Sequence, residues 1–307
     1  MSRWFLRAAV SLLVAVILFR IVPLAAVAGA LRRVSVPVWV GSLCIFVGGH
    51  YLNALKLRLL LGGDASLMPA CVRAQYAGLV ANLGLPGIAG GDLARAAYLA
   101  PLVGTGRVVL AGVTDRVLDS LTLLAIVAVA LPLAGVPAVL REGVRLRRGP
   151  AVAVVVVFVV GLLIVAVVWQ RMALGDRVAA AWSAVSARRS ALAAAVGISL
   201  SVQSAFVLTN VWLARSVGVT TGLAPWFVAW PLSKLIAVLP ISLGGIGVRE
   251  AALVSLLAPY GAPRDAVLAT GVLWQAVLAV SGLGGLLVTQ LMRLRTERPP
   301  GVSTGQP

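Results

Sequence analysis

Apolar residues run along this chain in long stretches, and the polar residues between them form short segments. A helix that crosses the hydrocarbon core of a bilayer needs about 20 mainly apolar residues. Six stretches reach that length, and each predicts a transmembrane helix: 8–30, 38–60, 117–137, 150–169, 191–214 and 266–291. The first is too long for a signal peptide and contains Arg20, so we expect it to be retained as a helix. The pattern predicts an all-α protein that crosses the membrane several times.

Two further apolar stretches, 74–90 and 225–243, each run into a proline that is followed by glycines. In both, Gly-Gly stands four and five residues after the proline of a Leu-Pro pair, and Arg stands nine residues after it. The matching residues are Leu85, Pro86, Gly90, Gly91 and Arg95 in the first stretch, and Leu239, Pro240, Gly244, Gly245 and Arg249 in the second. Such paired breaks in the two halves of a membrane protein are typical of transporter binding sites.

The two prolines lie 154 residues apart, which is about half of the chain. The same offset carries 38–60 onto 192–214 and 117–137 onto 271–291, and both land on predicted spans. We therefore predict two membrane repeats, at 1–140 and 150–292, joined by a basic linker at 141–149. A disordered cytoplasmic tail is expected at 293–307.

The broken stretches allow two topologies. If each enters the membrane and returns, each half has three full spans and the halves are inverted; if each crosses, the chain has eight spans and the halves are parallel. With a cytoplasmic N-terminus, and with the intramembrane Arg20 and Lys234 left out of the count, the re-entrant arrangement places 15 basic residues inside and 9 outside, against 13 and 11 for eight spans. The positive-inside rule therefore favours re-entrant segments, and both arrangements leave both termini in the cytoplasm. Tryptophans near the ends of apolar stretches are expected in an aromatic belt: Trp4, Trp39, Trp169 and Trp226.

Composition excludes a soluble enzyme. Hydrophobic residues make up 61% of the chain and charged residues 11%, whereas soluble domains carry about 25% charged residues. The net charge is +17, but the arginines are scattered in short loops and are not interleaved with aromatic residues. We therefore expect them to contact anionic lipid headgroups of the cytoplasmic membrane, and we expect no nucleic acid as a partner.

The sequence predicts no metal site and no cofactor. Cys44 and Cys71 lie among apolar residues and are expected to be buried thiols. His50 is the only histidine and has no carboxylate or thiol near it in the sequence, so a packing role is expected. No P-loop, Rossmann turn or nucleophile elbow is present, and no catalytic residue is predicted.

Arg95 and Arg249 are candidates for binding a phosphate group. Each stands close to the point where a helix restarts after the glycines, so the positive end of that helix would face the same space. Guanidinium can grip phosphate oxygens with two parallel hydrogen bonds. Alternatively, each arginine pairs locally, Arg95 with Asp92 and Arg249 with Glu250, and only holds its loop in place.

Asp115 and Asp119 are four residues apart, so they share one face of a helix, and Arg116 lies beside that face. Acidic groups in a membrane span are costly unless they are paired or hydrated. They could carry a coupled proton, or they could bind basic loop residues, and we favour the second interpretation.

Three segments resemble one family. They are similar to signatures of the lysylphosphatidylglycerol synthase transmembrane region, also called the flippase-like family. The first segment runs from Tyr76 to Arg95 and contains Asn82, the Leu-Pro pair and Gly-Gly-Asp. The second is Asp115-Arg116 with Asp119, and the third is 239–250. The resemblance covers nearly the whole chain and implies a membrane protein that handles lipids. The residues it implies as substrate-binding are Asn82, Pro86, Gly90, Gly91, Asp92, Arg95, Asp115, Arg116, Asp119, Pro240, Gly244, Gly245, Gly247, Arg249 and Glu250. The aminoacyl-transferase domain of some relatives does not follow before Pro307, so we do not expect aminoacylation of lipid.

These observations favour a lipid translocase that moves an amphipathic, anionic lipid across the cytoplasmic membrane. The alternative is a membrane-embedded enzyme, or its accessory subunit, acting on a polyprenyl-phosphate or phospholipid-linked substrate, with Asp92, Asp115, Asp119 and Glu250 as catalytic carboxylates. A non-transporting helical scaffold is a third interpretation. Membrane lipids are the expected partners, together with a second copy of the chain or a lipid-modifying enzyme.

Overall fold

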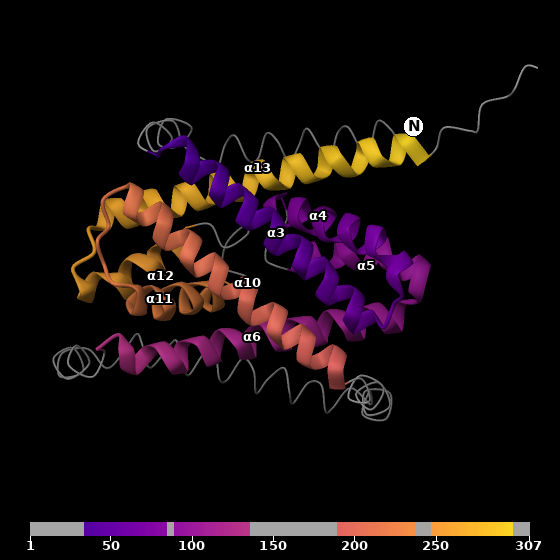
Figure 1. Ribbon diagram of the computed structural model, residues 1–307, viewed down its shortest axis with the longest axis horizontal. Coiled ribbons are helices and arrows are strands. Elements are labelled where there is room, and N and C mark those ends of the chain that lie inside the picture. The colour runs from indigo at the N-terminus through magenta and orange to yellow at the C-terminus, as the bar shows by residue number, and fades with distance from the viewer. Residues whose placement is uncertain (1–33, 85–88, 136–188, 238–246, 297–307) are drawn as a thin grey trace, which may run out of the picture.

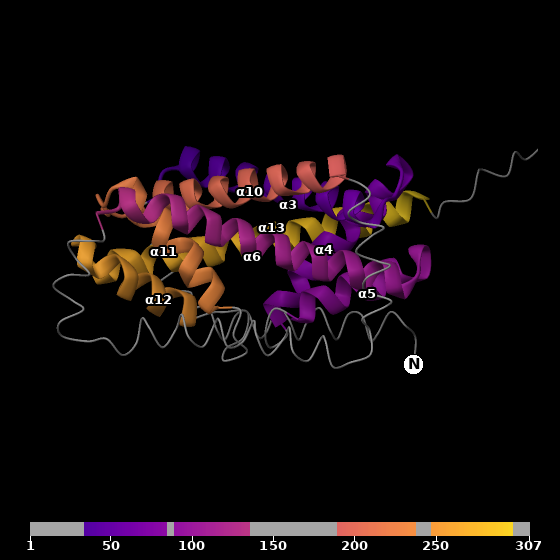
Figure 2. The same ribbon diagram turned by 90° about the horizontal axis from the view of Figure 1, so that it is seen from below.

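The computed structural model describes residues 34–84, 89–135, 189–237 and 247–296, and these ranges are helical with no strand. The elements are, in order, α3 (Val36–Leu61), η1 (Ala65–Leu67), α4 (Met68–Gly84), α5 (Ala89–Val103), α6 (Thr105–Leu133), α10 (Arg189–Ser216), α11 (Leu223–Ile236), α12 (Val248–Leu257), η2 (Ala258–Tyr260) and α13 (Arg264–Thr296). The all-α prediction is confirmed for this part of the chain. In Figure 2, α3 and α10 form one layer, and α5 and α12 lie farthest from it.

Within the described ranges, four helices are long and apolar enough to cross a membrane: α3, α6, α10 and the first 22 residues of α13. They correspond to the predicted spans at 38–60, 117–137, 191–214 and 266–291, while 8–30 and 150–169 lie outside the described residues. α6 begins at Thr105, well before its predicted start, because Asp115 and Arg116 pair with side chains of other helices and do not end the helix.

Two short helices mark each broken stretch, one within it and one after it. α4 packs against α5, and α11 packs against α12. Across the first break, the side-chain oxygen of Asn82 accepts a hydrogen bond from the backbone N–H of Gly91 at 2.8 Å, so α4 and α5 lie side by side there. A Cβ at Gly91 would stand 2.5 Å from the Asn82 amide, so this close approach requires glycine. Residues 85–88 and 238–246, which include Pro86, Pro240, Gly244 and Gly245, lie outside the described residues.

Each short pair also packs on a long helix from the other part of the chain. α4 contacts α13, and α11 contacts α6, so that the pairs lie toward opposite ends of the bundle in Figure 1. α3 and α10 contact each other directly, and the ring of Phe206 lies against Gly49, where a Cβ would come within 2.7 Å of it. These contacts bring side chains from α3, α5, α6, α10, α11 and α12 into the interior.

Two expectations about single residues are wrong. Trp226 has no exposed surface and is packed in the core, because α11 is covered by α6, α10 and α12. Cys44 is exposed, whereas Cys71 is buried as expected. Cys44 lies on the outward face of α3 that also carries Val40 and Val47, and an apolar neighbourhood in sequence does not distinguish a side chain facing lipid from one facing protein.

Candidate functional site

Lys56 on α3 lies at the centre of an interior group of charged side chains. Its ammonium nitrogen is 2.8 Å from a carboxylate oxygen of Asp115 and 2.7 Å from one of Asp119, both on α6. It also donates to the Ser199 hydroxyl on α10 at 3.0 Å, and that hydroxyl donates to Asp119 at 2.9 Å. Lys56 is completely buried, so its charge is balanced by protein groups alone.

Two arginines extend this group toward the edge of the bundle. Arg95 on α5 lies 3.5 Å from a carboxylate oxygen of Asp92 and 3.5 Å from one of Asp115. Arg116 on α6 grips both oxygens of Asp92 with two hydrogen bonds of 2.8 Å. The side chains of Arg116 and Asp92 are 38% and 36% exposed, so they form the open edge. We call Lys56, Asp92, Arg95, Asp115, Arg116 and Asp119 the ion-pair cluster, which contains three cations and three carboxylates.

A second group lies where α11 and α12 pack together. Lys234, in the last turn of α11, donates to the side-chain oxygen of Gln203 on α10 at 2.8 Å and lies 6.0 Å from the Phe206 ring centre. Arg249, in the first turn of α12, lies 5.4 Å from the Trp230 ring centre. We call Lys234, Arg249, Glu250 and the rings of Phe206, Trp230 and Trp274 the aromatic site.

Glu250 is fully engaged within the aromatic site. One of its oxygens accepts from the backbone N–H of Gly247 at 2.6 Å, and the other lies 2.6 Å from Arg249 and 3.5 Å from the Gln275 amide nitrogen. Gly247 has a φ of +84°, a conformation that favours glycine, and this turn lets its N–H point at the carboxylate. The helix start at α12 is therefore capped by its own acidic residue.

The aromatic rings next to the two cations contact one another through Trp274. Trp274 meets Trp230 edge to face, with ring centres 4.9 Å apart, and meets Phe206 at 5.4 Å. His50 packs against Phe46 at 4.4 Å and exchanges a hydrogen bond with Gln75 at 2.9 Å. The packing role expected for His50 is therefore observed.

The structure brings the predicted residues together in two separate groups. Asp92, Arg95, Asp115, Arg116 and Asp119 share the ion-pair cluster, and Arg249 and Glu250 share the aromatic site. The local pairing considered for each arginine is present, although Arg95 lies equally close to Asp115. Asn82, Gly90 and Gly91 stand at the α4–α5 break.

Sequence reasoning placed no functional weight on Lys56, Lys234, Ser199, Gln203 or Gln275. One signal could have identified the first two. They are the only lysines among 26 basic residues, and each interrupts an apolar helix, where an ionisable residue is costly unless it has a partner or a function. Ser199 and Gln203 lie one turn apart on α10 and contact one lysine each, so this helix face joins the two groups.

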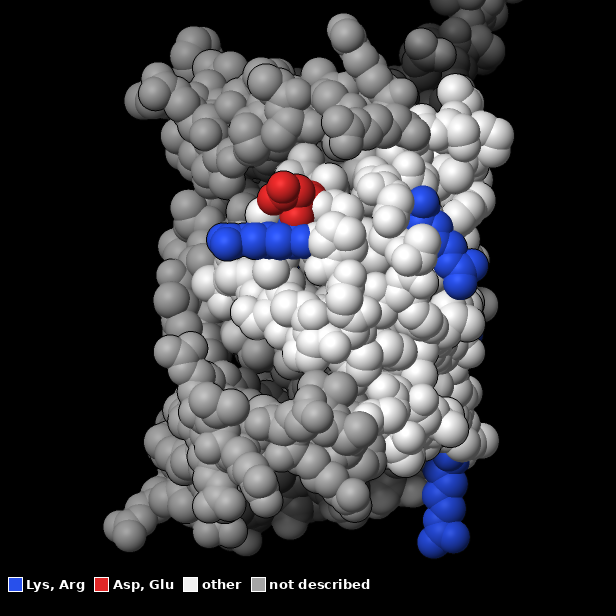
Figure 3. Space-filling model, turned by 90° about the vertical axis from the view of Figure 1, so that its left-hand side faces the viewer, with Lys and Arg blue, Asp and Glu red and all other residues white. Residues whose placement is uncertain are grey.

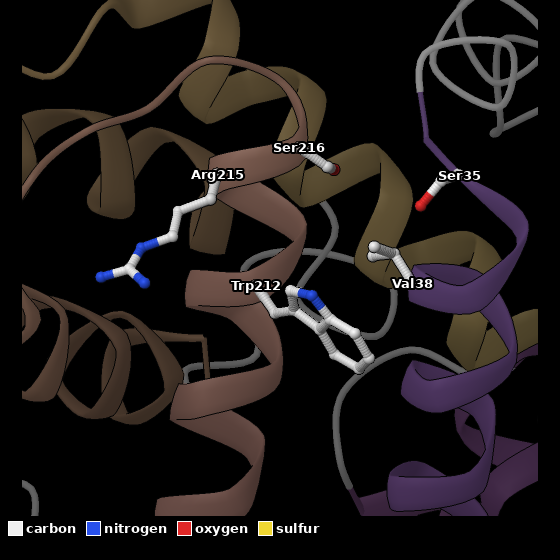
Figure 4. Close-up of a pocket in the computed structure, with 5 residues that line it drawn as sticks. All are labelled: Ser35, Val38, Trp212, Arg215 and Ser216. Atoms are coloured by element: carbon white, nitrogen blue, oxygen red, sulfur yellow. The ribbon is translucent and has the colours of Figure 1, made fainter.

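A surface pocket of about 380 Å³ lies apart from both groups, between the start of α3 and the end of α10. Figure 4 shows that Ser35, Val38 and Trp212 face it, whereas the Arg215 side chain extends away from Ser35 and Val38. At the end of the molecule seen in Figure 3, the described surface carries few charged side chains; one acidic and one basic side chain lie against each other, and the other basic side chains lie apart from them. Within the described ranges, no three His, Cys, Asp or Glu side chains gather in a way that could hold a metal ion.

Comparison with known proteins identifies the family. No curated protein and no solved structure matches the chain. The family model described as lysylphosphatidylglycerol synthase TM region matches residues 4–284, which is nearly the whole chain and includes both broken stretches. Together with the four apolar spans, this match makes the chain a membrane protein and confirms the resemblance seen in the sequence. The protein belongs to the lysylphosphatidylglycerol synthase TM region family.

Proposed function

We propose that this protein is a lipid translocase of the cytoplasmic membrane, which moves an amphipathic, anionic lipid between the two leaflets. Family membership indicates a role connected with membrane lipids. The observation that carries the proposal is the presence of two groups of charged side chains inside a bundle of apolar helices. Such groups are rare in membrane interiors and typically mark the path of a polar or charged substrate.

The position of these groups supports a translocation path. Arg95 and Arg249 lie on α5 and α12, each just after one of the two broken stretches. A helix that begins inside a membrane protein directs its N-terminal backbone N–H groups toward the cavity it faces, which favours an anion. A phospholipid phosphate could therefore pass between cationic groups while its acyl chains remain in the bilayer.

The enzyme alternative receives less support from the geometry. It needs carboxylates free to accept or donate a proton, yet Asp92, Asp115, Asp119 and Glu250 each contact a cation. We therefore favour movement of the lipid over chemical change.

We propose further that the chain consists of two inverted repeats with re-entrant helix pairs. The bounds of α3, α4, α5 and α6 recur in α10, α11, α12 and α13 at nearly the offset that separates the two prolines. The contacts recur as well: α5 on α6 matches α12 on α13, and α4 on α13 matches α11 on α6. α11 has 14 residues, or about 21 Å of helix, which is shorter than a hydrocarbon core of about 30 Å.

Reconstitution into liposomes tests translocation directly. Phosphatidylcholine liposomes containing a trace of phosphatidylglycerol with a fluorescent headgroup label are treated with an impermeant reductant, which destroys only the outer-leaflet label. We expect the protein to raise the reducible fraction above that of protein-free liposomes, with no new lipid species in mass spectra. A new lipid product without leaflet movement would favour the enzyme. The absence of both leaflet movement and a new product would favour a scaffold.

Arginine substitutions test the headgroup contact. Arg95→Ala or Arg249→Ala removes a charge-assisted contact worth about 1.5–3 kcal/mol, which corresponds to roughly 10- to 150-fold weaker binding of an anionic lipid. Arg→Lys is expected to recover part of this loss, because ammonium keeps the charge but not the two-point grip. Unchanged lipid binding by stably folded Arg95→Ala and Arg249→Ala proteins would eliminate the contact.

Thiol labelling tests the inverted arrangement. Single cysteines at Gly90 and Gly244, in a chain lacking Cys44 and Cys71, are expected to react with impermeant reagents from opposite sides of the membrane. Labelling of both positions from one side would contradict inverted repeats and favour parallel ones.

A further inference from the structure

Among the described residues Lys234 forms no salt bridge, whereas the other interior lysine, Lys56, forms two. Its contact with a hydrogen-bond acceptor among the described residues is the neutral side-chain oxygen of Gln203. Its other neighbour is the face of Phe206, which attracts a cation but carries no net charge. Lys56, by comparison, lies between two carboxylates at 2.8 and 2.7 Å.

The carboxylate of the aromatic site is not available to Lys234. Glu250 already receives the Gly247 N–H, the Arg249 guanidinium and the Gln275 amide on its two oxygens. The aromatic site therefore holds two cations and one carboxylate among the residues that the structure describes. One positive charge remains to be balanced, and in a membrane interior such a charge favours an anionic ligand.

Unused hydrogen-bond donors accompany this charge. The Nε of Arg249 and the indole N–H of Trp230 are buried and have no hydrogen-bond partner in the described part of the chain. Arg249 is 7% exposed and Trp230 is 2% exposed, so water gives them little compensation. A buried donor without a partner costs about 1–3 kcal/mol, and a bound oxyanion would remove that cost.

Lys234 lies within the second broken stretch, 225–243, and Arg249 follows it. Lys234 is in the last turn of α11 and Arg249 in the first turn of α12. Both rest on rings that contact Trp274, Lys234 on Phe206 and Arg249 on Trp230. The first broken stretch has no equivalent lysine, because Val80 occupies the position 154 residues before Lys234.

We propose that Lys234 and Arg249 form a binding site for a singly charged lipid phosphodiester, and that Lys234 makes this site select an anionic over a zwitterionic headgroup. The proposal rests on the lipid-handling function proposed above and names the residue that sets its charge preference. One phosphodiester anion balances the single excess positive charge. A choline headgroup brings its own cation, and the faces of Phe206 and Trp230 that would attract it are already occupied by Lys234 and Arg249.

Lipid titration of the full-length protein in detergent tests the proposal. Phosphatidylglycerol, phosphatidylcholine and inorganic phosphate are titrated separately, and the bound fraction is measured by native mass spectrometry. We expect Lys234→Met to weaken phosphatidylglycerol binding about 10-fold or more, the size of one charge-assisted contact. Phosphatidylcholine binding should stay unchanged, and Lys234→Arg should keep most of the preference.

The matched control is Arg215→Met, which removes an exposed cation at the far end of α10 and should leave both lipid affinities unchanged. If Lys234→Met does not fold, Lys234→Gln retains a donor to Gln203 and serves in its place. Equal loss of both lipids, or unchanged phosphatidylglycerol binding by a folded Lys234 variant, would overturn the proposal. Lys234-dependent binding of inorganic phosphate without lipid binding would overturn the lipid assignment.

Binding and leaflet movement are separate measurements, so the two proposals can fail independently. Lys234-dependent selection of phosphatidylglycerol without any leaflet movement would support the charge-selective site and contradict translocation. Leaflet movement that is identical for the native protein and Lys234→Met would support translocation and, with unchanged binding, contradict the site.

Discussion

The ion-pair cluster and the aromatic site each contain one lysine of this chain, but they balance its charge in opposite ways. Lys56 lies between the carboxylates of Asp115 and Asp119 and donates to the Ser199 hydroxyl. Lys234 has an amide oxygen and an aromatic ring. A buried cation inside a membrane protein can therefore have either of two roles. One that is paired with a carboxylate of the protein stabilises the fold, and one without such a partner attracts an anionic ligand.

The two arrangements also differ in how much stability they contribute. Removing one partner of a buried ion pair leaves an unbalanced charge and costs about 3–5 kcal/mol. A cation on an aromatic face contributes about 0.5–2 kcal/mol, which does not replace a counter-ion. We therefore expect changes in the ion-pair cluster to affect folding first, and changes in the aromatic site to affect ligand binding first.

The largest expected effect follows from removing the cation of the ion-pair cluster. Lys56→Met leaves Asp115 and Asp119 facing each other without their ammonium partner, and we expect a loss of about 3–5 kcal/mol of stability. Thermal unfolding in detergent measures this loss. Lys234→Met, the matched change in the aromatic site, is expected to unfold at nearly the native temperature.

A triple variant provides the control for this prediction. Lys56→Met combined with Asp115→Asn and Asp119→Asn removes the ammonium charge and both carboxylate charges. This variant should therefore recover part of the stability that Lys56→Met loses. If Asp115→Asn with Asp119→Asn instead leaves a stable protein whose lipid movement no longer depends on pH, these carboxylates carry a coupled proton. That result would contradict a purely structural role for the ion-pair cluster.

The next largest effect is expected from displacing Glu250, whose contacts with Gly247 and Arg249 keep its carboxylate away from Lys234. A Cβ at Gly271 on α13 would stand 2.5 Å from Cγ of Glu250, so Gly271→Ala must displace this side chain. Overpacking of this kind costs about 1–3 kcal/mol, and thermal unfolding measures it. If the displaced carboxylate reaches Lys234, phosphatidylglycerol binding should fall as well.

Gly284→Ala is the matched control, because it lies on the same helix and a Cβ there meets nothing within 4 Å. We expect it to leave both stability and lipid binding close to native. Equal effects of the two alanines would mean that α13 tolerates no added methyl group, and the result for Gly271 would then say nothing about Glu250.

Much of the fold could be predicted from the sequence, because long apolar runs specify membrane helices directly. Predicted spans at 38–60 and 191–214 differ from α3 and α10 by only one or two residues at each end. The start of α6 was missed because a search for apolar residues stops at Asp115 and Arg116, whose partners lie on other helices. Trp226 was misplaced for a similar reason, since an apolar run does not reveal which neighbours cover it.

The candidate site was predictable only where its residues are close in sequence. The shared face of Asp115 and Asp119 followed from helix geometry. Their partners did not, because Lys56 is 63 residues from Asp119 and 143 residues from Ser199 in the chain. The unequal charge balance of the two groups depends on these distant contacts and could not be inferred from the local pattern.

The smallest expected effect concerns the open edge of the ion-pair cluster, where Arg116 meets Asp92. Both side chains are more than one third exposed, so polar surroundings already screen their attraction, and exposed pairs contribute up to about 1 kcal/mol. A double-mutant cycle with Arg116→Gln and Asp92→Asn isolates this pair from the weaker contact of Asp92 with Arg95 at 3.5 Å. We expect a coupling energy below about 1 kcal/mol, measured by thermal unfolding, against several-fold more for the pair of Lys56 and Asp119. Because Arg116 holds Asp92 with only modest energy, an anionic lipid at this edge could displace the carboxylate. A coupling as large as that of the buried pair would show that the edge is sealed, and the ion-pair cluster would then offer no contact to a ligand at all.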